Sequence, residues 1–587
     1  MAALKPGSRL LDHPLIRKYS RLVREDLSAT FSRDVQKWLL VAPIVGVVTG
    51  LIVTGVAIVI LRMTWPIVFN AYVNHHWTIV PGLLIGFLLT GLIMAYRTSD
   101  PNEHSTEEII RSYHEHQGAI DMKPFWWKLL AAVTTVGSGG SAALEGPSIY
   151  GGGAIGSWLW TRLRRLGLQP HDRRIMLISG AAAGMAAVFR APLTGIIFAL
   201  EMPYKDDIAH EALLPSLIAS VVAYATMVAI MGSEPLFGFS GSTAFSPADL
   251  LWSALLGLMC GLVAMVFAIT FRRARTFAVN APIPHTMKLL IGGFGTAICG
   301  LLFVTFFAGP LIPLGPNYEA VREVLSTPHS STRLVSFAIL KLTGTLFSIG
   351  SGGVSAAFVP LFLSGGAIGS AFGQTVVRST TFDLYAAVGM ASFIAAGYKT
   401  PLAAVVFVAE TTGGHSYIIP SLIGAAIAYA VSGEASVSGD QRVHEVARLA
   451  ELSGIAVREV MQREIAAVQA GTNLRDFAQS AAAQRRAVFA VYDGARAVGT
   501  IAAWQLAQIP PEQWPATTVG QIADHHVPRV PPDYQVTDAL QLLSREKSAQ
   551  LLFVGTEDGG LEGVVTKTDI LRALQTRGIA RVRDRVA

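Results

Sequence analysis

Charged residues are scarce in this chain of 587 residues. Asp, Glu, Lys and Arg make up 15% of it and hydrophobic residues 51%, whereas soluble domains carry about 25% charged residues. This composition excludes an ordinary soluble protein of the same length. Stretches without any of these four residues reach the length of about 20 residues that crosses a bilayer. They include Leu39–Leu61, Trp77–Tyr96, Ala212–Ser233, Leu250–Phe271 and Leu289–Tyr318, the last interrupted by prolines. They predict a polytopic α-helical membrane protein, not a barrel of alternating strands.

Only two cysteines are present, Cys260 and Cys299, and both lie inside apolar runs. A disulfide framework and a zinc motif are thereby excluded, and buried thiols are expected. The net charge of +6 is attributed to the cytoplasmic flanks of the spans. Basic clusters interleaved with aromatic residues are lacking, so we expect no nucleic-acid binding.

A basic leader precedes the first apolar run, which starts near Leu39. That run comes too late for a cleavable secretory signal, and the positive-inside rule places a basic leader in the cytoplasm. Residues 1–35 are therefore predicted to form an amphipathic segment at the cytoplasmic membrane face.

Two segments of the chain are near copies of one another. GSGGSAALEGPSIYGGGAIGS starts at Gly137, GSGGVSAAFVPLFLSGGAIGS starts at Gly350, and the two align without a gap. Each is followed by a second repeated segment, at a slightly shorter spacing: RAPLTGIIFALE, which ends at Glu201, and KTPLAAVVFVAE, which ends at Glu410. Repeated apolar segments broken by Gly and Pro predict the binding site of a transporter built from an internal repeat.

The first copy predicts a broken helix with a carboxylate at its tip. In Glu145-Gly146-Pro147 the proline falls in the first helical turn, where its missing N–H does no harm, and Val359-Pro360 repeats the arrangement. The positive ends of two such helices would hold an anion with backbone amides. Acids that cap helices are common, but ionisable residues inside a membrane are usually functional, so Glu145 is interpreted as a gate.

These segments together resemble the CLC family of chloride channels and chloride/proton antiporters. The resemblance covers most of residues 36–433 and implies a membrane domain over 36–439 with an internal inverted repeat, its halves at about 36–205 and 206–433. It implies a homodimer, a bacterial plasma membrane location with both termini in the cytoplasm, and anion transport without a cofactor. The implied anion site contains Leu144, Glu145, Gly146, Ala357, Phe358, Val359 and Ser438.

Two acids receive different interpretations. Glu201 matches the family's internal proton-transfer glutamate, which is typical of the antiporters. Its repeat mate Glu410 is interpreted as structural. Because the same acid occurs at the end of both repeated helices, a purely structural role is the alternative for Glu201 as well.

Three departures from the family pattern affect the mechanism. The usual GSGIP segment is missing, and its serine falls near Glu103, His104 or Ser105, with Thr106 as a further substitute. The inner tyrosine falls near Ser438, where none is found, and the basic residue before the gate is Leu144. These gaps predict a wide inner entrance, and so a weakly coupled or uncoupled chloride pathway. Proton-coupled antiport through Glu201 is the alternative.

Composition changes after about Ser438, and the tail contains two further copies, at 440–515 and 516–587. Each has the pattern of a leading helix, a strand, a helix, two strands and a helix. The tail resembles a soluble α/β pair of CBS domains. The resemblance implies an adenine nucleotide (AMP, ADP or ATP) at Gly563, Thr566 and Asp569, with the acid on the ribose hydroxyls and the helix N-terminus at a phosphate. The first copy lacks the hydroxyl and the acid, and a structural pair without ligand is the alternative.

A group of acids and histidines precedes and begins the predicted helix near residue 105. His114 and His116 are two residues apart and face different sides of a helix, so a solvated segment is favoured over a metal site. The full group is Glu103, His104, Glu107, Glu108, His114, Glu115 and His116.

The competing functions are a fluoride-exporting relative, a CBS-containing magnesium transporter and a nucleotide-sensing enzyme. The sequence lacks the asparagine-rich segment that a fluoride exporter has in place of GSGIP. It also lacks the acid clusters within the spans that a magnesium transporter needs, and the tail shows no set of catalytic residues. We therefore expect a chloride transporter, modulated by its cytoplasmic CBS pair, and not an enzyme.

Overall fold

A computed structural model describes residues 33–102, 104–166, 168–233, 237, 244–379, 381–442, 455–463, 466–484, 488–494, 496–525, 527–545, 551–555, 561–566 and 569–570. The chain forms two compact units, residues 1–445 and 446–587. Most of the predicted amphipathic leader, residues 1–32, lies outside the described residues.

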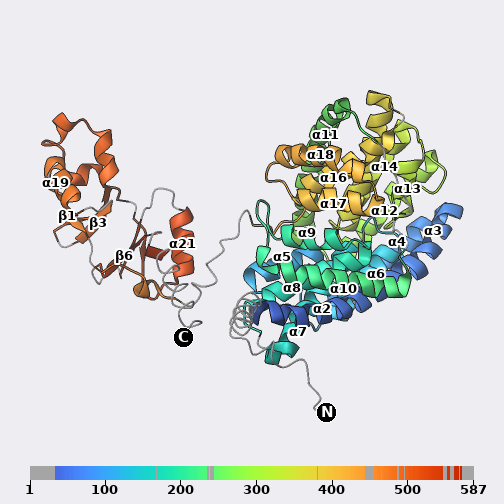
Figure 1. The fold of residues 1–587 in the computed structure, drawn as a ribbon, viewed down its shortest axis with the longest axis horizontal. Helices are drawn as coiled ribbons and strands as arrows, with labels where there is room; N and C mark the ends of the chain where they lie inside the picture. The colour runs from blue at the N-terminus through green and yellow to red at the C-terminus, as the bar shows by residue number, and fades with distance from the viewer. Residues whose placement is uncertain are drawn as a thin grey trace, which may run out of the picture. The chain divides into compact units, whose positions relative to one another are not determined.

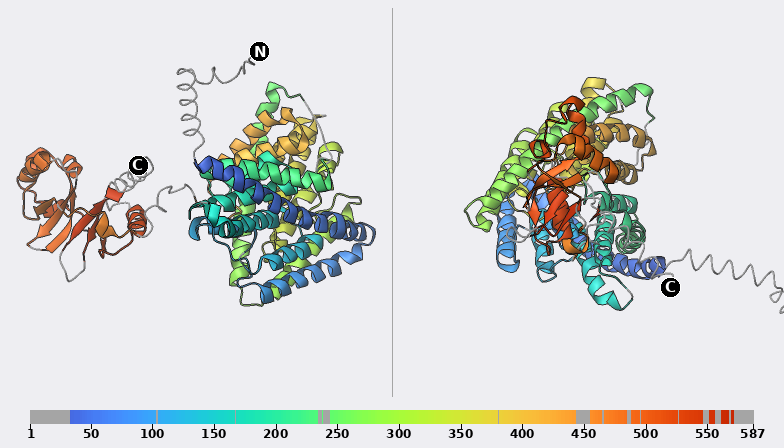
Figure 2. Two further views of the ribbon diagram at one scale, coloured as in Figure 1. Left: turned by 60° about the horizontal axis from the view of Figure 1, so that its bottom comes forward. Right: turned by 90° about the vertical axis from the view of Figure 1, so that its left-hand side faces the viewer.

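In its described residues, every regular element of the first unit is a helix (Figures 1 and 2). Its first half contains α2 (Arg33–Ile58), α3 (Trp65–Asn74), α4 (Ile79–Arg97), α5 (Ser105–Glu115), α6 (Phe125–Gly137), α7 (Glu145–Leu163), α8 (Asp172–Phe189) and α9 (Pro192–Glu201). Its second half contains α10 (Leu213–Met231), α11 (Pro247–Asn280), α12 (His285–Phe306), α13 (Glu319–Ser326), α14 (Ser331–Ser348), α15 (Phe358–Phe372), α16 (Phe382–Tyr398), α17 (Pro401–Thr412) and α18 (Ile418–Val431).

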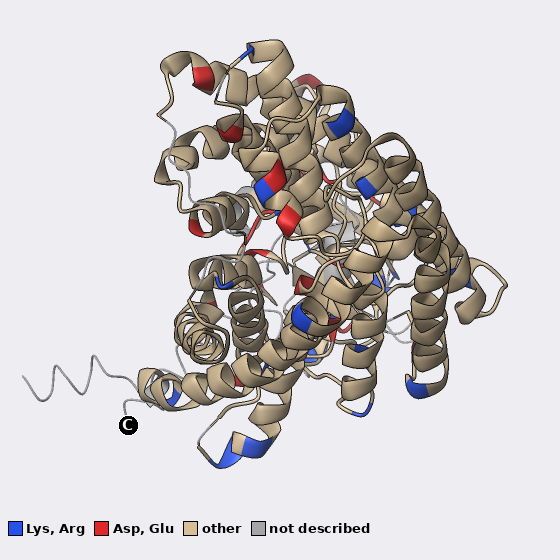
Figure 3. Cartoon of the chain, turned by 90° about the vertical axis from the view of Figure 1, so that its right-hand side faces the viewer, with Lys and Arg blue, Asp and Glu red and all other residues tan. Residues whose placement is uncertain are grey.

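The charge-free stretches form helices long enough to cross a bilayer. Within the described residues there are five such spans, at Val35–Asn74, His76–Arg97, His210–Met231, Pro247–Asn280 and His285–Phe306. Long parts of the helical ribbon carry no charged residue (Figure 3). The last span ends at Phe306, before Pro310, as the prolines predict. Apolar side chains on these helices remain exposed, among them Leu51, Leu217 and Leu262, as expected of lipid-facing surfaces.

The sequence repeat is also a packing repeat. Helix α7 packs on α8, and α15 packs on α16. A Cβ added to Gly152 of α7 would lie 2.0 Å from the carbonyl oxygen of Gly180 in α8, and one added to Gly365 of α15 would lie 2.3 Å from that of Gly389 in α16. The glycines of α7 and α15 are aligned by the first repeated segment, and those of α8 and α16 keep the spacing of the second. Small residues allow this close backbone approach.

The two copies meet at the starts of α7 and α15. Ala143 and Ala356, which directly precede these helices, form an antiparallel bridge. Ser355 reinforces it, because its hydroxyl accepts a hydrogen bond from the Ala143 N–H at 3.0 Å and donates one to the Ala143 carbonyl. The helix N-termini are thus tied tip to tip, and the copies run in opposite directions where they meet.

The described part of the second unit contains two three-stranded sheets. One has the order β1 (Ala467–Gln469), β2 (Val488–Asp493), β3 (Arg496–Ala502), with α19 (Leu474–Gln484) between its first two strands. The other has the order β4 (Arg529–Val530), β5 (Leu551–Val554), β6 (Gly563–Thr566), with α21 (Val536–Arg545) in the same place. In each sheet the first pair is parallel and the second antiparallel, which agrees with the expected order of a strand, a helix and two strands; the closing helix expected of the second copy lies largely outside the described residues.

The two tail copies exchange their leading segments. Gln462, which leads the first copy, exchanges backbone hydrogen bonds with Val564 in the sheet of the second, at 2.8 and 3.0 Å. Asp524, which leads the second copy, exchanges them with Thr500 in the sheet of the first, at 2.8 and 2.9 Å. Each copy is therefore completed by the other, which boundaries drawn along the sequence do not reveal.

The close approach of α7 and α8 predicts that Gly156 tolerates no side chain. A Cβ there would lie 1.9 Å from the carbonyl oxygen of Met176, whereas a Cβ on Gly55 of α2 meets no atom within 4 Å. We expect Gly156→Ala to lower the free energy of unfolding by about 1–3 kcal/mol or more, as overpacking does, and Gly55→Ala to leave it nearly unchanged. Melting temperatures of both purified variants in mild detergent test this, and equal temperatures would contradict it.

Candidate functional site

The carboxylate of Glu145 lies against the backbone of the opposite repeat. Its Oε1 accepts a hydrogen bond from the Phe358 N–H at 2.6 Å, and its side chain is fully buried. Its Oε2 has no hydrogen-bond partner among the described residues. Phe358 is the repeat mate of Glu145 and begins α15, where helical N–H groups have no partner in their own helix. The site thus holds an anionic group with a backbone amide.

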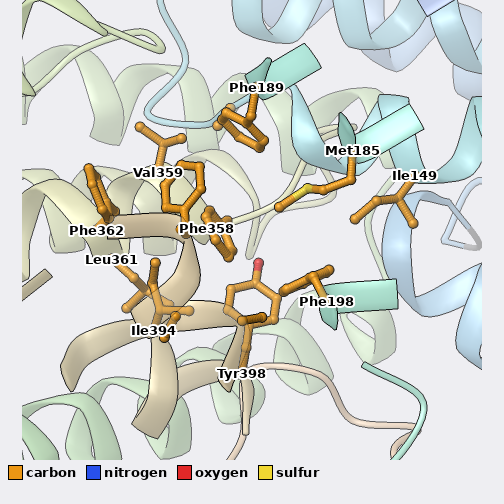
Figure 4. Packing of buried hydrophobic residues seen from close by; sticks show 14 of the residues in the cluster. Ile149, Met185, Phe189, Phe198, Phe358, Val359, Leu361, Phe362, Ile394 and Tyr398 are labelled. Carbon is orange, nitrogen blue, oxygen red and sulfur yellow. The ribbon is translucent and has the colours of Figure 1, made fainter. Parts of the chain in front are cut away.

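A tyrosine hydroxyl satisfies the neighbouring amide. The Ala357 N–H donates to the Tyr398 hydroxyl at 2.8 Å, and Tyr398 is the last residue of α16. Its ring centroid lies 5.8 Å from those of Phe358 and Phe198. In Figure 4 the hydroxyl points into the space among Phe358, Phe198 and Met185. Since this oxygen accepts the amide hydrogen, its own hydrogen is free to donate.

The other residues predicted from the first repeat pair lie at the same place. Leu144 precedes Glu145 and is fully buried, as is Val359 after Phe358. Gly146 has no room for a side chain, since a Cβ would lie 2.7 Å from the Ser355 carbonyl carbon. The structure therefore brings together Leu144, Glu145, Gly146, Ala357, Phe358 and Val359. We call this group the cradle.

Ser438 lies beside the cradle, on a small cavity. The cavity has a volume of about 20 Å³, and its lining includes Ser438, Tyr398, Ala357, His104 and Ser105. This is room for about one water molecule. Ser438 is buried, and its N–H donates to the hydroxyl of Ser436 at 3.2 Å.

A tyrosine contacts the cradle although none stands near Ser438 in the sequence. Tyr398 supplies one from the end of α16, well before the position near Ser438 where it is sought in the sequence. Alignment with a family pattern can find a tyrosine only at the matching position along the chain. It does not find a tyrosine whose hydroxyl reaches the same place from a different helix. Tyr398 also lines the cavity of about 20 Å³ beside the cradle, and the wide inner entrance stays a prediction.

Glu201 and Glu410 cap each other's helices. Glu201 ends α9, and its carboxylate accepts hydrogen bonds from the N–H groups of Leu402 at 3.2 Å and Ala403 at 2.9 Å, in the first turn of α17. Glu410, near the end of α17, accepts from the N–H groups of Leu193 at 3.0 Å and Thr194 at 2.8 Å, in the first turn of α9. The architectural interpretation thus applies to both acids.

Three of the acids and histidines around α5 are held by other partners. Glu107 forms an ion pair with Arg275 at 2.6 Å and Glu108 one with Lys128 at 2.6 Å. His114 Nε2 lies 2.7 Å from the Pro203 carbonyl oxygen. Glu103 lies outside the described residues. These contacts give the group roles in packing α5 against its neighbours.

In the tail, the three predicted nucleotide residues lie on β6 and directly after it: Gly563 begins the strand, Thr566 ends it and Asp569 follows. The Asp569 carboxylate accepts from the N–H of Thr566 at 2.9 Å and from its hydroxyl at 2.7 Å, and its other oxygen accepts from the Gln462 amide. Asp569 is 5% exposed. Gly563 lies against Met461, whose sulfur would be 2.7 Å from an added Cβ. Asp569 therefore has a structural duty at the strand–helix junction.

Three residues of the site were not found from the sequence: Tyr398, Phe198 and Ser355. A signal for the first was present, because Tyr398 directly precedes the repeated KTPLAAVVFVAE segment, and the alignment of that segment with RAPLTGIIFALE makes it the mate of Phe189. Both rings lie against Phe358, with centroids 5.8 and 5.7 Å away. The repeat could therefore have indicated the pair.

Comparison with known proteins gives consistent similarities. The voltage gated chloride channel family matches residues 82–433, and the CBS domain family matches residues 519–576. The H(+)/Cl(-) exchange transporter ClcA of Klebsiella pneumoniae is 27% identical over 405 residues, which cover 66% of this chain and 83% of that protein. Both predicted resemblances are confirmed.

Solved structures share the fold. A CLC-type fluoride/proton antiporter aligns with a TM-score of 0.61 and 22% identity, covering 70% of this chain and 98% of its own. A eukaryotic CLC transporter aligns with a TM-score of 0.58 and 18% identity, covering 92% of this chain and 98% of its own.

Proposed function

This chain belongs to the voltage gated chloride channel family and is a CLC-type anion transporter, and from that premise we propose that it exchanges chloride for protons, with Glu145 as the gate. Family membership and multi-pass membrane insertion follow from the match over residues 82–433 and from the five spans. The identity of the anion, the coupling to protons and the role of the tail are proposals.

One observation carries the gate: the Glu145 carboxylate accepts the Phe358 N–H at 2.6 Å in a fully buried site. A carboxylate there acts as a tethered anion, in the position that a permeant halide would take at a helix N-terminus. Protonation of Glu145 removes its charge and weakens this hydrogen bond, because bonds to charged acceptors are the stronger ones. The side chain then leaves the amide to chloride, so proton binding and anion binding are linked at one place.

Exchange requires that the two sides of the site never open together. On one side of the cradle the closing group is Glu145; on the other, Tyr398 holds the Ala357 N–H at 2.8 Å beside a cavity of about 20 Å³. The sequence favours weak coupling because an inner tyrosine is missing near Ser438. The contact of Tyr398 with Ala357 beside this cavity is the observation that supports exchange here.

Glu201 is the candidate for the second proton site. It is 6% exposed and sits at the end of α9, directly before the turn at Met202. Its carboxylate caps α17 with only one hydrogen bond to each oxygen, which leaves acceptor capacity for a proton or a water molecule.

Passive chloride conductance is the second candidate function. Leu144 stands where the family has a basic residue, and the GSGIP segment is missing, so two elements of the exchanger pattern are lost. Fluoride as the anion is a variant of either function. Proteoliposomes that contain the full chain distinguish these cases when halide flux and external pH are followed together.

We also propose a homodimer in a bacterial plasma membrane, with both termini in the cytoplasm, and regulation by an adenine nucleotide bound to the CBS tail. Helix α10, near the predicted interface at Ala212–Ser233, exposes Leu213, Leu217 and Val221, which suits either lipid or a second copy. The tail proposal rests on Gly563 and Thr566 of β6 and on Asp569, which follows the strand.

We expect Glu145→Gln to abolish proton movement driven by a chloride gradient while anion flux continues and no longer depends on pH. The amide is permanently neutral, like the protonated acid, so it cannot act as a tethered anion. Glu211→Gln, which changes an exposed acid, is the control and should behave as the unaltered protein. Loss of all anion flux in a folded Glu145→Gln protein would show that Glu145 is not a gate.

Glu201→Gln and Glu410→Gln form a matched pair. Each weakens one helix cap, which is worth about 1 kcal/mol, so both should lower the melting temperature to a similar extent. Only Glu201→Gln should stop proton movement, since Glu410 is structural on this proposal. Proton uptake into chloride-loaded proteoliposomes, measured beside the melting curves, tests the pair. Equal effects of both variants on proton movement would remove the special role of Glu201.

We expect ATP to raise the melting temperature of the full chain, because a ligand that binds the folded state stabilises it, by about 2.7 kcal/mol at 100 times its Kd. Asp569→Ala should start from a lower temperature, since Thr566 and Gln462 lose their acceptor, and should show no rise with ATP. Asp533→Ala, at an exposed acid of the tail, is the control. No rise with ATP, ADP or AMP in the unaltered protein would leave a structural CBS pair.

A further inference from the structure

The basic end of α11 forms a groove whose lining combines arginines with apolar side chains. The groove has a volume of about 570 Å³. It is lined by Ile269, Arg272, Arg273, Thr276, Phe277 and Asn280 of α11, and by Ala435 in the segment after α18. Among the described residues, this lining includes no acid and shares no member with the cavity beside the cradle.

Helix α11 is longer than a bilayer core is thick. Its 34 residues span about 51 Å at 1.5 Å each, whereas a hydrocarbon core measures about 30 Å. The helix carries no charge from Leu250 to Phe271, and Arg272, Arg273 and Arg275 follow directly. The groove therefore lies where the span meets the lipid headgroups, and the positive-inside rule assigns it to the cytoplasmic leaflet, in the orientation proposed above.

One face of α11 leads from lipid-facing side chains into the groove. Leu262, Val266 and Ile269 are exposed and recur every three or four residues, which places them on a single helix face. Arg273 and Phe277 of the groove continue this spacing. A hydrocarbon chain that lies along this face thus ends at the arginines.

The two arginines of the groove keep their charge available. Both are exposed, and neither forms an ion pair within the described residues. Arg272 is within electrostatic range of Glu107, but the acids of the neighbouring segments pair with other bases: Glu107 with Arg275 at 2.6 Å, Glu434 with Lys205 at 2.7 Å and Asp440 with Arg111 at 3.0 Å. An anion at the groove would therefore meet two positive charges without a competing carboxylate.

We propose that this groove binds an anionic phospholipid of the cytoplasmic leaflet, with its phosphate at Arg272 and Arg273 and an acyl chain along Ile269 and Phe277. Arginine suits phosphate because its planar group presents paired N–H donors. A free phosphate ion would leave the apolar part of the lining in water, and a zwitterionic lipid would bring a positive charge to the arginines. An anionic lipid matches both parts of the lining, and basic pockets at cytoplasmic helix ends bind such headgroups.

The test titrates phosphatidylglycerol into the full chain in mild detergent and follows bound lipid by native mass spectrometry. Phosphatidylcholine with the same acyl chains and inorganic phosphate are titrated in parallel. Arg272→Gln/Arg273→Gln removes both charges of the groove. Arg162→Gln/Arg165→Gln is the matched control, because it removes two exposed arginines at the end of α7, outside the lining.

We expect phosphatidylglycerol to bind about tenfold more tightly than phosphatidylcholine, and inorganic phosphate not to displace it. Arg272→Gln/Arg273→Gln should weaken phosphatidylglycerol binding about 25-fold, since each basic residue near an anionic lipid contributes about fivefold. The control should stay within about twofold of the unaltered protein, and neither variant should change the melting temperature without lipid, because the altered side chains are exposed.

Four results would overturn the proposal: an unchanged affinity in Arg272→Gln/Arg273→Gln, an equal loss in the control, equal affinity for both lipids, or displacement of phosphatidylglycerol by inorganic phosphate, which would assign the groove to a free anion. If the double variant does not fold, Arg273→Gln decides, with an expected loss of about fivefold; an unchanged affinity there contradicts the site. Lipid binding is measured without ion flux, so failure of the proposed chloride/proton exchange leaves this test intact.

Discussion

The whole membrane unit depends on how unpaired helix N–H groups are satisfied where α7 and α15 meet. No bulk water is present in a bilayer core, so each such group needs an acceptor from the protein or from a ligand. Three side chains provide acceptors at this point: the Ser355 hydroxyl for the Ala143 N–H, the Tyr398 hydroxyl for that of Ala357 and the Glu145 carboxylate for that of Phe358. Two of these acceptors are neutral and fixed by their surroundings, whereas the third is charged. An anion can replace a carboxylate at an amide without leaving it unpaired, and this exchange of acceptors is the physical basis of gating proposed here.

The position of the two tips follows from packing further along the same helices. Glycines of α7 touch carbonyl oxygens of α8, and their mates in α15 touch α16. A side chain at these contacts would push the helices apart and move the tips relative to each other. Since a hydrogen bond weakens steeply with misalignment, a shift of this kind would open the Glu145 contact. The glycine-rich sequence is thus part of the site, although no glycine needs to touch the anion.

The sequence carries the repeat, and the repeat predicts much of the structure. The alignment of the two copies identifies the helix tips, the position of Glu145 opposite Phe358 and the equivalent glycine contacts, because each depends on local sequence copied twice. Features that depend on meetings between different elements could not be predicted in the same way. Tyr398 reaches the cradle from the end of α16, and the leading segments of the two tail copies exchange places. A sequence pattern shows which residues belong to the same helix or strand. It does not show which other element packs against them.

In both units, each repeat copy provides hydrogen-bond partners for the other copy. In the membrane unit, Glu201 caps the helix that ends near Glu410, and Glu410 caps the helix that ends at Glu201. In the tail, Gln462 pairs with the sheet of the opposite copy and also donates to Asp569. Repeated copies can complete each other in this manner because the same unsatisfied groups recur in both.

The buried polar groups of the chain are therefore of two kinds. Some have all their hydrogen-bond partners within the protein, and others have an atom without a partner in the part of the chain that the structure describes. Both oxygens of Glu410 and of Asp569 accept hydrogen bonds from neighbouring residues, and each holds a fixed junction. One oxygen of Glu145 and one nitrogen of His104 have no partner among the described residues, although both side chains are buried. Burying a polar atom without a partner is unfavourable, and in Glu145 that atom belongs to the same carboxylate that accepts the Phe358 N–H. Tyr398 connects the two places, because its ring packs on Phe358 of the cradle and it lines the cavity of His104. An anion that replaced the Glu145 carboxylate at the Phe358 N–H would leave the contact of Tyr398 with the Ala357 N–H in place, so one acceptor of the cradle can change while the other holds the helix tip.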